Sequence, residues 1–357
     1  MKFSLFQPLP YFAPELPTGW PQAPRHFDPE YGLKSVQQNM DIIDAADEGG
    51  FDYISVAEHH YAARQMCPSP TLAAALISQR LKNASVAILG VDLPLHNPVR
   101  IAEELAMLDA FGKGRLLVGM FRGTPNEYIT YGHNPAESKA RFEEALHLVL
   151  AAWTEPEPFG WEGIHYRNRL VSIWPQPVQR PRPPVLVSGN SPSSAEFAAK
   201  HRLKIGLSFA PVEVIPRMVA VYREAAARHG WEPTADDILW RGFAYVAETD
   251  DKAQADCARY EFGDLNGILA PNERQLPTWA AMMGELAASG GFGGPPPSSV
   301  KLPAIMGSPD TVIGRLEAVR AAGVGIADLI LSSDRLPAEK GIDGIRLFTK
   351  EVIPAFR

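Results

Sequence analysis

The stretch ASVAILGVDLPLHNPVRIAEELAMLDAFGKGRLLVGMF (residues 84–121) reads as a strand, a helix and a second strand. Residues 84–93 are almost continuously apolar, which is typical of a parallel strand with both faces covered. Asn97 is placed to cap the next helix, Pro98 takes its first position, and residues 115–121 return to a strand-like run. A β-α-β unit of this kind predicts a parallel sheet with a right-handed crossover.

The same alternation runs along most of the chain. Strand-like runs are expected at residues 2–7, 51–58, 84–93, 115–121, 185–189, 205–210, 240–248 and 326–333. Helix-like runs are expected at 31–50, 69–83, 97–114, 136–153, 193–201, 213–230, 308–323 and 341–356. The even spacing of these units favours a (β/α)8 TIM barrel with insertions over an open doubly wound sheet, which also fits. We expect residues 1–357 to form a single barrel domain.

One segment interrupts this rhythm, and it is the largest insertion, before the last β-α units. Residues 251–303 begin with a probable helix and continue into SGGFGGPPPSS (289–299). Clustered glycines and three consecutive prolines exclude a helix or a central strand there. Two interpretations remain open, a surface insertion and a mobile lid over the mouth of the barrel, with residues 285–303 as its ordered or disordered part.

Composition narrows the functional classes. The chain has 357 residues, 46% of them hydrophobic, and a formal net charge of −7. An acidic balance argues against nucleic acid and anionic membranes as partners, and no apolar run is long enough to span a bilayer. The two cysteines, Cys67 and Cys257, stand far apart, which indicates no disulfide framework and fits a reducing cytoplasm. Neither a dinucleotide-binding G-x-G-x-x-G after a strand nor a P-loop occurs, so direct NAD or ATP binding through those motifs is disfavoured.

The segment VAEHHY (56–61) places Glu58, His59 and His60 at the end of a predicted strand. In a barrel, active sites form at the carboxyl ends of the strands. A zinc site is disfavoured because no HExxH, CxxC or HxH pattern supplies further ligands. A histidine that titrates near neutral pH suits proton transfer, and the alternative is a structural triplet in which Glu58 orients a histidine.

A second group of residues is suited to an anion. In VLVSGNSPSSAEFAAKH (185–201) a strand ends and a helix begins with Ser191, Ser193 and Ser194 at its start. Free N–H groups and hydroxyls at a helix N-terminus bind phosphate, although Ser191 is explained equally by ordinary capping. Arg122 follows the strand 115–121 and Arg141 begins a later helix, so both are candidate phosphate clamps or, singly, surface groups. A barrel with this group would suit a mononucleotide or a phosphosugar.

Gly90 interrupts an otherwise ideal strand. Such a glycine marks a bulge, an unusual peptide or a flat ligand against the backbone, and simple close packing explains it as well.

Several motifs together resemble the bacterial luciferase-like, flavin-dependent monooxygenases, and in particular the luciferase α chain. The segments VAEHHY, LPLHNPVRIAEELAMLDAFGKGR, GMFRG, NSPSSAEFAAKH and GSPDTVIGRL occur in the family's order. The resemblance implies a (β/α)8 barrel, reduced FMN (FMNH2) supplied by a separate flavin reductase, and O2 as co-substrate. It also implies a C4a-peroxyflavin that oxygenates a small organic substrate, such as a carbonyl compound.

The resemblance also assigns residues. His59 matches the active-site histidine, Glu58 lies beside the flavin ring, and Leu89–Gly90 matches a non-proline cis peptide under that ring. The remaining positions are the phosphate ligands Arg122, Arg141, Ser191 and Ser194, and the flavin neighbours Thr124, Ser188 and Asn190. No metal is implied.

The chain departs from the luciferase α chain at two positions of the resemblance. Phe121 stands where that chain has a reactive cysteine, and Phe209 where it has a tryptophan, which argues against light emission. Two alternatives stay open: a deazaflavin (F420)-dependent dehydrogenase on the same barrel, and a flavin-binding protein without catalysis. Family dimers imply a homodimer here through the apolar segments 71–78 and 101–111.

Overall fold

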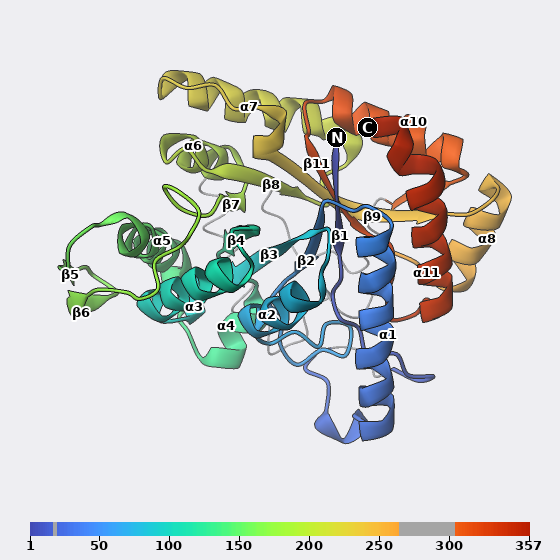
Figure 1. Ribbon diagram of the computed structural model, residues 1–357, viewed down its shortest axis with the longest axis horizontal. Helices are drawn as coiled ribbons and strands as arrows, with labels where there is room; N and C mark the ends of the chain where they lie inside the picture. The colour runs from blue at the N-terminus through green and yellow to red at the C-terminus, as the bar shows by residue number, and fades with distance from the viewer. Residues whose placement is uncertain (17–19, 264–303) are drawn as a thin grey trace.

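A closed barrel of parallel strands forms the centre of the molecule (Figure 1). The computed structural model describes residues 1–16, 20–263 and 304–357. The barrel strands are β1 (Lys2–Phe6), β2 (Tyr53–Val56), β3 (Ser85–Asp92), β4 (Leu116–Phe121), β7 (Val185–Ser188), β8 (Lys204–Ser208), β9 (Ile238–Val246) and β11 (Ile326–Ile330). They neighbour one another in the order β9-β11-β1-β2-β3-β4-β7-β8, and β8 pairs again with β9. This last pairing closes the ring, so the barrel prediction is confirmed and the open sheet is wrong.

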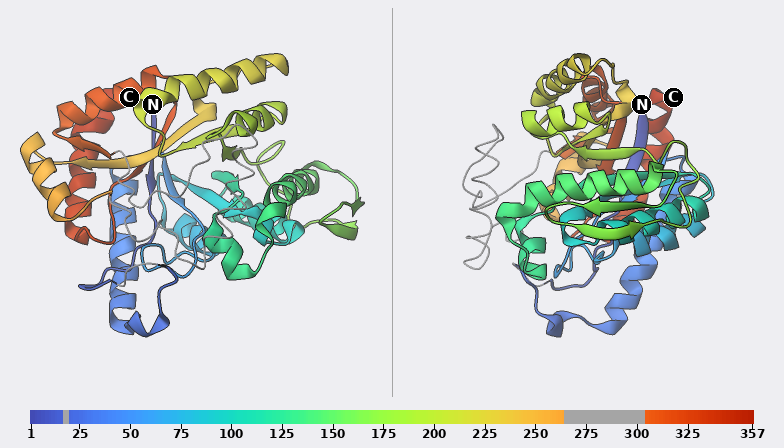
Figure 2. Two further views of the ribbon diagram at one scale, coloured as in Figure 1. Left: turned by 180° about the vertical axis from the view of Figure 1, so that it is seen from behind. Right: turned by 90° about the vertical axis from the view of Figure 1, so that its left-hand side faces the viewer.

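Helices surround the barrel on its outer side (Figure 2). They are α1 (Pro29–Glu48), α2 (Pro70–Arg80), α3 (Pro98–Phe111), α4 (Pro125–Tyr131), α5 (Ser138–Thr154), α6 (Pro192–Lys200), α7 (Ile215–Arg228), α8 (Asp250–Arg259), α10 (Pro309–Ala321) and α11 (Ala338–Leu347). The predicted cap of α3 is present, because Oδ1 of Asn97 accepts the N–H groups of Val99 and Arg100. Ser69 accepts the N–H of Leu72 at the start of α2 in the same way.

Five elements lie outside the predicted pattern or change it. An antiparallel hairpin of β5 (Phe159–Glu162) and β6 (Arg167–Val171) lies between α5 and β7 in the chain, and β10 (Ala304–Gly307) pairs in parallel with the end of β9. The short helix α4 follows β4 directly. The helix expected at 341–356 is shorter, because α11 passes into a π-helical turn (Phe348–Val352) and a 3-10 turn (Ile353–Phe356). Of the predicted insertion 251–303, α8 is described, and the lid at 285–303 lies outside the described residues.

The main hydrophobic core fills the space between the barrel and its helices, and a smaller apolar group lies inside the barrel. Burial of this much apolar surface is the dominant stabilising contribution. The inside group consists of Ala87, Leu89, Leu117, Leu186, Leu239 and Ile326. Six positions from five strands thus contribute interior side chains, as TIM barrels require.

A buried ion pair joins the neighbouring strands β9 and β11, next to those interior side chains. Nε of Arg241 on β9 donates to Oδ2 of Asp328 on β11 over 2.6 Å, and the hydroxyl of Ser55 donates to Oδ1 of Asp328 over 2.7 Å. The Arg241 guanidinium also lies 3.8 Å from the ring centroid of Phe6. One charged pair therefore contacts residues of four strands, β1, β2, β9 and β11. Separately, none of the helices in the described part of the chain is long and apolar enough to cross a membrane.

Candidate active site

Four neighbouring strands, β2, β3, β4 and β7, end at the same mouth of the barrel. Because all four are parallel, the segments after them meet at one edge: residues 57–60, 93–97, 122–127 and 189–194. Of the predicted site residues, Leu89 and Gly90 lie within β3 and Arg141 lies on α5, and the others lie in or directly before one of these segments.

Glu58 is the polar centre of this edge. Its side chain is fully buried, and its carboxylate accepts Nε2 of His60 at 3.1 Å and Nε2 of His96 at 2.8 Å. The main-chain N–H of Asp92 donates to the same carboxylate over 3.0 Å. Burial by itself raises the pKa of Glu58, but the bonds from His60 and His96 outweigh it and lower the pKa to about 2. The Glu58 carboxylate therefore orients two imidazoles, as the structural interpretation of VAEHHY expected. It does so at the carboxyl end of a barrel strand, which is where the functional interpretation placed the site.

His59 points to a different carboxylate. Its Nδ1 lies 3.1 Å from Oε1 of Glu127, which is buried, whereas the His59 side chain is 32% exposed. Oε2 of Glu127 accepts the N–H of Thr124 at 3.1 Å and also the Thr124 hydroxyl. Burial raises the pKa of Glu127, but the hydrogen bond and charge of His59 prevail and lower it. His59 is thus oriented by a fixed carboxylate, with Nε2 left for other contacts.

Glu127 was not among the residues that the sequence pointed to. Its signal is the run TPNE (124–127), in which Thr124 caps α4 and Glu127 closes a capping box three residues later. The box explains why Glu127 has a fixed position. Its second partner, His59, could not be found in the same way because the two residues follow different strands. His96 was missed for the same reason, since its partner Glu58 lies 38 residues earlier.

Asp92 is a third buried carboxyl group at this edge. Its side-chain oxygen Oδ2 is buried and has no hydrogen-bond partner among the described residues. Burial and the nearby charges of Glu127 and Glu58 raise its pKa well above the ordinary 3.8. Of the three buried acids at this edge, Asp92 is therefore the one whose ionisation is disfavoured.

The peptide bond between Leu89 and Gly90 is cis, as the resemblance implied. A Cβ atom on Gly90 would stand 2.3 Å from the Phe121 ring and 2.7 Å from the carbonyl oxygen of Gly119. Close packing against β4 therefore suffices to require glycine at position 90, and the cis peptide and the register shift between Leu89 and Val91 show that the position is also an unusual peptide at a bulge. Phe121 occupies the space directly beside the cis peptide.

The start of α6 has the capping that the simpler interpretation expected. Oγ of Ser191 accepts the N–H of Ser194 at 3.2 Å, and the N–H of Ser191 donates to Oγ of Ser194 over 3.1 Å. Ser193 lies in the same group, with its hydroxyl 3.1 Å from that of Ser191. Three hydroxyls and the positive end of a helix thus meet at one point, which is the donor set that a phosphate group prefers.

Ser188 and Asn190 lie at the end of β7. The side-chain amide of Asn190 accepts the N–H of Ser208 at 3.1 Å and donates to the Ser208 carbonyl over 3.3 Å. The hydroxyl of Ser188 accepts the N–H of Asn190 at 3.4 Å. The Asn190 side chain therefore joins the ends of β7 and β8, and of this residue mainly the backbone remains for a ligand.

The two arginines reach this edge by different routes. Arg122 directly follows β4, and β4 pairs with β7, the strand that leads to Ser191. The main-chain carbonyl of Arg122 is held by the hydroxyl of Tyr128 on α4. The 122–124 loop is thus tied to the helix that carries Glu127.

Arg141 lies in the first turn of α5. The next residue, Phe142, has its ring 6.1 Å from that of Phe197 on α6, so the start of α5 packs against α6. Nε of Arg141 donates to Glu137 over 2.8 Å. Arg141 therefore lies on a helix that contacts α6, and it shares its charge with an acidic neighbour.

The side chains at this edge of the barrel fit a flavin mononucleotide better than a metal ion. Within residues 1–16, 20–263 and 304–357, no three His, Cys, Asp or Glu side chains are grouped so that they could hold a metal ion. The serine-rich helix start and the arginines supply donors for a phosphate. The imidazoles of His59 and His96 lie at neighbouring strand ends, where the remainder of such a ligand would extend.

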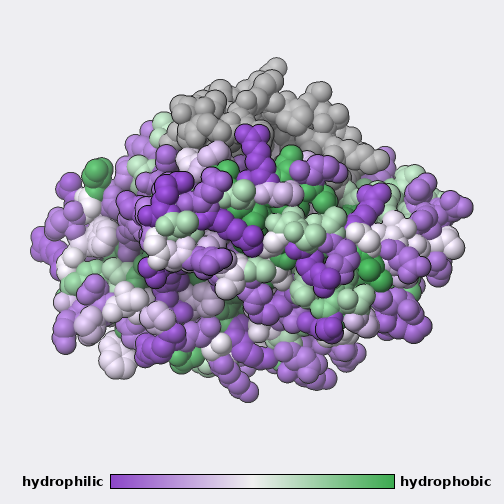
Figure 3. All heavy atoms as spheres, turned by 90° about the horizontal axis from the view of Figure 1, so that it is seen from above, coloured by the Kyte–Doolittle hydropathy of each residue, from purple (hydrophilic) through white to green (hydrophobic). Residues whose placement is uncertain are grey.

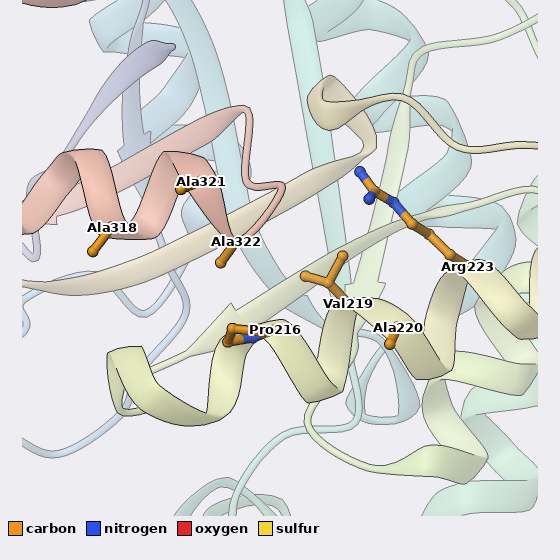
Figure 4. Close-up of a pocket in the computed structure, with 7 residues that line it drawn as sticks. All are labelled: Pro216, Val219, Ala220, Arg223, Ala318, Ala321 and Ala322. Carbon is orange, nitrogen blue, oxygen red and sulfur yellow. The ribbon is translucent and has the colours of Figure 1, made fainter.

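A separate surface pocket of about 520 Å³ lies between α7 and α10 (Figure 4). Its walls are small apolar side chains and one arginine: Pro216, Val219, Ala220, Arg223, Ala318, Ala321 and Ala322. No acid or base accompanies Arg223 among the residues that line this pocket, so the pocket offers no proton chemistry.

The face that is uppermost in Figure 1 is largely hydrophilic, with apolar residues in small groups (Figure 3).

The sequence matches the family model described as luciferase-like monooxygenase over residues 11–325. The oxygenase component of flavin-dependent trigonelline monooxygenase from Acinetobacter baylyi is 24% identical over 325 residues, which cover 89% of each chain. The uncharacterized protein y4wF of Sinorhizobium fredii is 30% identical over 202 residues, which are 56% of this chain. That match covers 58% of y4wF, less than two thirds of its length.

Solved structures agree with the fold. Monooxygenase RslO1 from Streptomyces bottropensis superposes with a TM-score of 0.76 at 27% identity, over 100% of both chains. The oxygenating constituent of 3,6-diketocamphane monooxygenase from Pseudomonas putida, solved with FMN, gives 0.73 at 22% identity and covers 99% of this chain and 98% of that one. An F420-dependent secondary alcohol dehydrogenase gives 0.69 at 16% identity, covering 100% and 99%. The last two likenesses concern the fold alone.

Proposed function

The chain belongs to the luciferase-like monooxygenases, and from that premise we propose that it uses reduced FMN and O2 to oxygenate a small organic substrate. The observation that carries the proposal is the arrangement at one barrel edge. His59, which follows β2, is held by the buried Glu127, which follows β4, and β4 is the neighbour of β7, the strand that leads to the serine-rich start of α6. Proton-handling groups and phosphate donors thus lie around one mouth.

In this proposal the phosphate of FMN is bound by the start of α6 and by the two arginines. Arginine forms charge-assisted hydrogen bonds to phosphate, and the helix N-terminus adds N–H donors. Glu58 and the Leu89–Gly90 peptide would border the flavin ring, with the backbone at Thr124, Ser188 and Asn190 around it. When bound, reduced FMN supplies the electrons that activate O2, and the chain supplies position and protons. The proposed phosphate ligands are Arg122, Arg141, Ser191 and Ser194.

His59 is the proposed general acid and base. With Nδ1 directed to the Glu127 carboxylate, the imidazole presents Nε2 as the atom that gives or takes a proton. The fixed carboxylate keeps the ring in one orientation, which is the usual role of such a partner. The surrounding mouth would exclude water, so that reducing equivalents reach the substrate rather than forming hydrogen peroxide.

The proposal also includes partners. A separate flavin reductase would supply reduced FMN, and the trigonelline relative is itself described as an oxygenase component. The chain would form one barrel domain and act in the cytoplasm, as its two buried free cysteines allow.

We further propose a homodimer through α2 and α3. These helices expose an apolar patch made of Leu72, Leu76, Met107 and Phe111. Leu72 and Leu76 lie one turn apart on α2, and Met107 and Phe111 lie one turn apart on α3, which packs beside α2. Large exposed apolar side chains gathered in this way mark an interaction surface.

The proposed activity is tested by replacing His59 with Asn or Ala. Binding of oxidised FMN, followed by fluorescence, should be retained, while product formation from FMNH2 and O2 with a panel of substrates should be lost and hydrogen peroxide should accumulate. Unchanged coupled turnover would remove His59 from the mechanism. An F420-dependent dehydrogenase is distinguished by the same purified protein, because it would bind oxidised F420, reduce it as the substrate is oxidised, and consume no oxygen.

A further inference from the structure

The short helix α4 is tied to the loop before it by hydrogen bonds in both directions. The hydroxyl of Tyr128 donates to the main-chain carbonyl of Arg122. The carboxylate of Glu127 accepts the N–H and the hydroxyl of Thr124, which is the capping box of this helix. Because each of these bonds joins a residue of the helix to a residue of the loop, residues 122–128 form one compact unit.

The two helix side chains that make these bonds are buried. Tyr128 is fully buried, and Glu127 is 1% exposed. Burial and then Asp92 raise the pKa of Tyr128, and the charge of Arg122 does not offset this rise. The Tyr128 hydroxyl therefore keeps its proton and remains a donor to the Arg122 carbonyl. A hydrogen bond in such a place, shielded from water, holds its two ends together more firmly than an exposed one.

This unit joins the two functional ends of the proposed site. Its first residue is Arg122, whose side chain is a proposed phosphate ligand. Near its other end, Oε1 of Glu127 lies 3.1 Å from Nδ1 of His59. Among the described residues, Glu127 is the hydrogen-bond partner that the His59 ring has, so the orientation of the imidazole depends on the position of α4.

The loop itself has little freedom to absorb a change at Arg122. Gly123 has φ +84°, and a Cβ atom there would stand 3.2 Å from the carboxyl carbon of Asp92 at the end of β3. The loop is thus packed closely against β3 on one side and bonded to α4 on the other. A restriction imposed on Arg122 is therefore passed to the helix.

We propose that Tyr128 is a positioning residue that couples phosphate binding at Arg122 to the orientation of His59. A phosphate that engages the Arg122 side chain restricts the loop, and Tyr128 passes this restriction to α4 through the Arg122 carbonyl. Glu127, the adjacent residue, then holds the imidazole in one orientation. The part of the flavin that does not react thereby prepares the group that handles protons. The inference rests on the proposed function in the roles of Arg122 and His59.

The first experiment uses the cofactor-free protein with ¹⁵N-labelled histidine and inorganic phosphate added at constant ionic strength. The His59 NMR signals are identified by their loss in His59→Asn. Phosphate should shift and sharpen these signals up to a saturating limit in the wild-type chain, and it should leave them unchanged in Arg122→Gln. In Tyr128→Phe, phosphate binding should remain measurable by titration calorimetry, but the His59 signals should not respond even at saturation.

Each outcome of this titration has a defined meaning. A His59 response that persists in Tyr128→Phe, or wild-type protein that binds phosphate without any His59 response, would overturn the coupling alone. A wild-type chain that binds no phosphate would overturn the phosphate assignment as well. Should Tyr128→Phe not fold, 3-fluorotyrosine at position 128 keeps the hydroxyl, and its ¹⁹F signal should move with the His59 signals as phosphate is added. A ¹⁹F signal that stays still while His59 responds would exclude Tyr128 as the link.

Tyr222→Phe is the matched control. Tyr222 on α7 is also fully buried, and its hydroxyl donates to the main-chain carbonyl of Leu203 over 2.6 Å. Both phenylalanine variants should lose a similar amount of thermal stability, because each loses one buried hydrogen bond to a carbonyl. Only Tyr128→Phe should abolish the His59 response. Loss of the response in both variants would reduce Tyr128 to a structural residue.

The second experiment divides the flavin into two parts. Reduced riboflavin lacks the phosphate, so the wild-type chain should use it mainly to form hydrogen peroxide. Added inorganic phosphate should raise product formation about fivefold or more in the wild-type chain and in Tyr222→Phe, but not in Tyr128→Phe. An equal rise in Tyr128→Phe would overturn the proposal. Absence of product from FMNH2 itself in the wild-type chain would count against the proposed function and leave the NMR result unaffected.

Discussion

His59 and Glu127 are separated by 68 residues in the chain, yet Nδ1 of the histidine lies 3.1 Å from Oε1 of the glutamate. The fold of the barrel mouth creates this contact, because His59 follows β2 and Glu127 lies on the short helix after β4. The glutamate is held from its other side by Thr124. The imidazole is therefore oriented by the fold rather than by its sequence neighbours.

Replacement of Glu127 by Gln tests this orientation. Glutamine preserves the capping box of α4, so the helix should form, but the negative charge beside His59 disappears. We expect a fall of about 100-fold in coupled turnover, because the imidazole loses the carboxylate that orients it. FMN affinity should change little. Glu339→Gln, an exposed glutamate in the first turn of α11, is the matched control, and equal effects in the two variants would contradict the assigned role of Glu127.

Replacement of Glu58 by Gln tests the stability that the buried carboxylate provides. The folded pKa of about 2 lies below the ordinary 4.5, so the folded state binds the proton less tightly than the unfolded state. The stabilisation is present above about pH 4.5 and is lost as the pH falls through about 2. Glu58→Gln should lower the free energy of unfolding near neutral pH by about 3 kcal/mol, and the difference from wild type should shrink in acid. Urea unfolding at several pH values measures both, and a difference that does not depend on pH would refute the linkage.

Asp92→Asn should show the opposite pH dependence. The raised pKa of Asp92 means that ionisation disfavours the folded state above about pH 4. The variant cannot ionise, so its stability relative to wild type should increase as the pH rises toward the folded pKa. The same urea titrations measure this trend, and a relative stability that falls with rising pH would show that Asp92 is ionised in the folded protein.

The phosphate assignment is tested by comparing two flavins. Arg122→Gln should weaken FMN binding about 10-fold or more, because a charge-assisted hydrogen bond is lost. Riboflavin, which lacks the phosphate, should bind the variant and the wild type equally. Arg100→Gln on the exposed face of α3 serves as the control. If riboflavin binding weakens as much as FMN binding, Arg122 acts on something other than the phosphate.

The proposed dimer is tested by Leu76→Glu. Leu76 is 67% exposed on α2, so a glutamate there is harmless to a monomer but places a charge inside the interface. Light scattering after size-exclusion chromatography should change from dimer to monomer. Ile164→Glu, at the even more exposed tip of the β5–β6 hairpin, should remain dimeric. A Leu76→Glu protein that stays dimeric would place the interface elsewhere.

The barrel could be predicted because its signals are local. Apolar runs mark the strands, and capped helix starts such as Asn97–Pro98 separate them, so all eight barrel strands were anticipated. The β5–β6 hairpin was missed because its side chains alternate between half-buried and exposed without a sustained apolar run. The helix α4 was missed because it has only seven residues and begins directly after a strand.

The site was predictable only in part, for a physical reason. Glu58 and His59 are neighbours in the chain and were found together, but their partners His96 and Glu127 belong to other strand ends. Such contacts depend on strand order, which no short motif records. At the start of α6 both interpretations remain valid, since the capping of Ser191 by Ser194 is present and phosphate binding stays a prediction.

The pairing of β1 with β11 has a consequence for the synthesis of the protein on the ribosome. Residues 2–5 lie in register with residues 326–329, so β1 lacks one of its two neighbours until β11 has been synthesised. Throughout translation its free edge offers N–H and C=O groups to any other nascent strand. Only the emergence of β11, bringing Asp328 to Ser55 and Arg241, removes that exposed edge. Co-translational binding by a chaperone should therefore persist until residues 326–330 have left the exit tunnel.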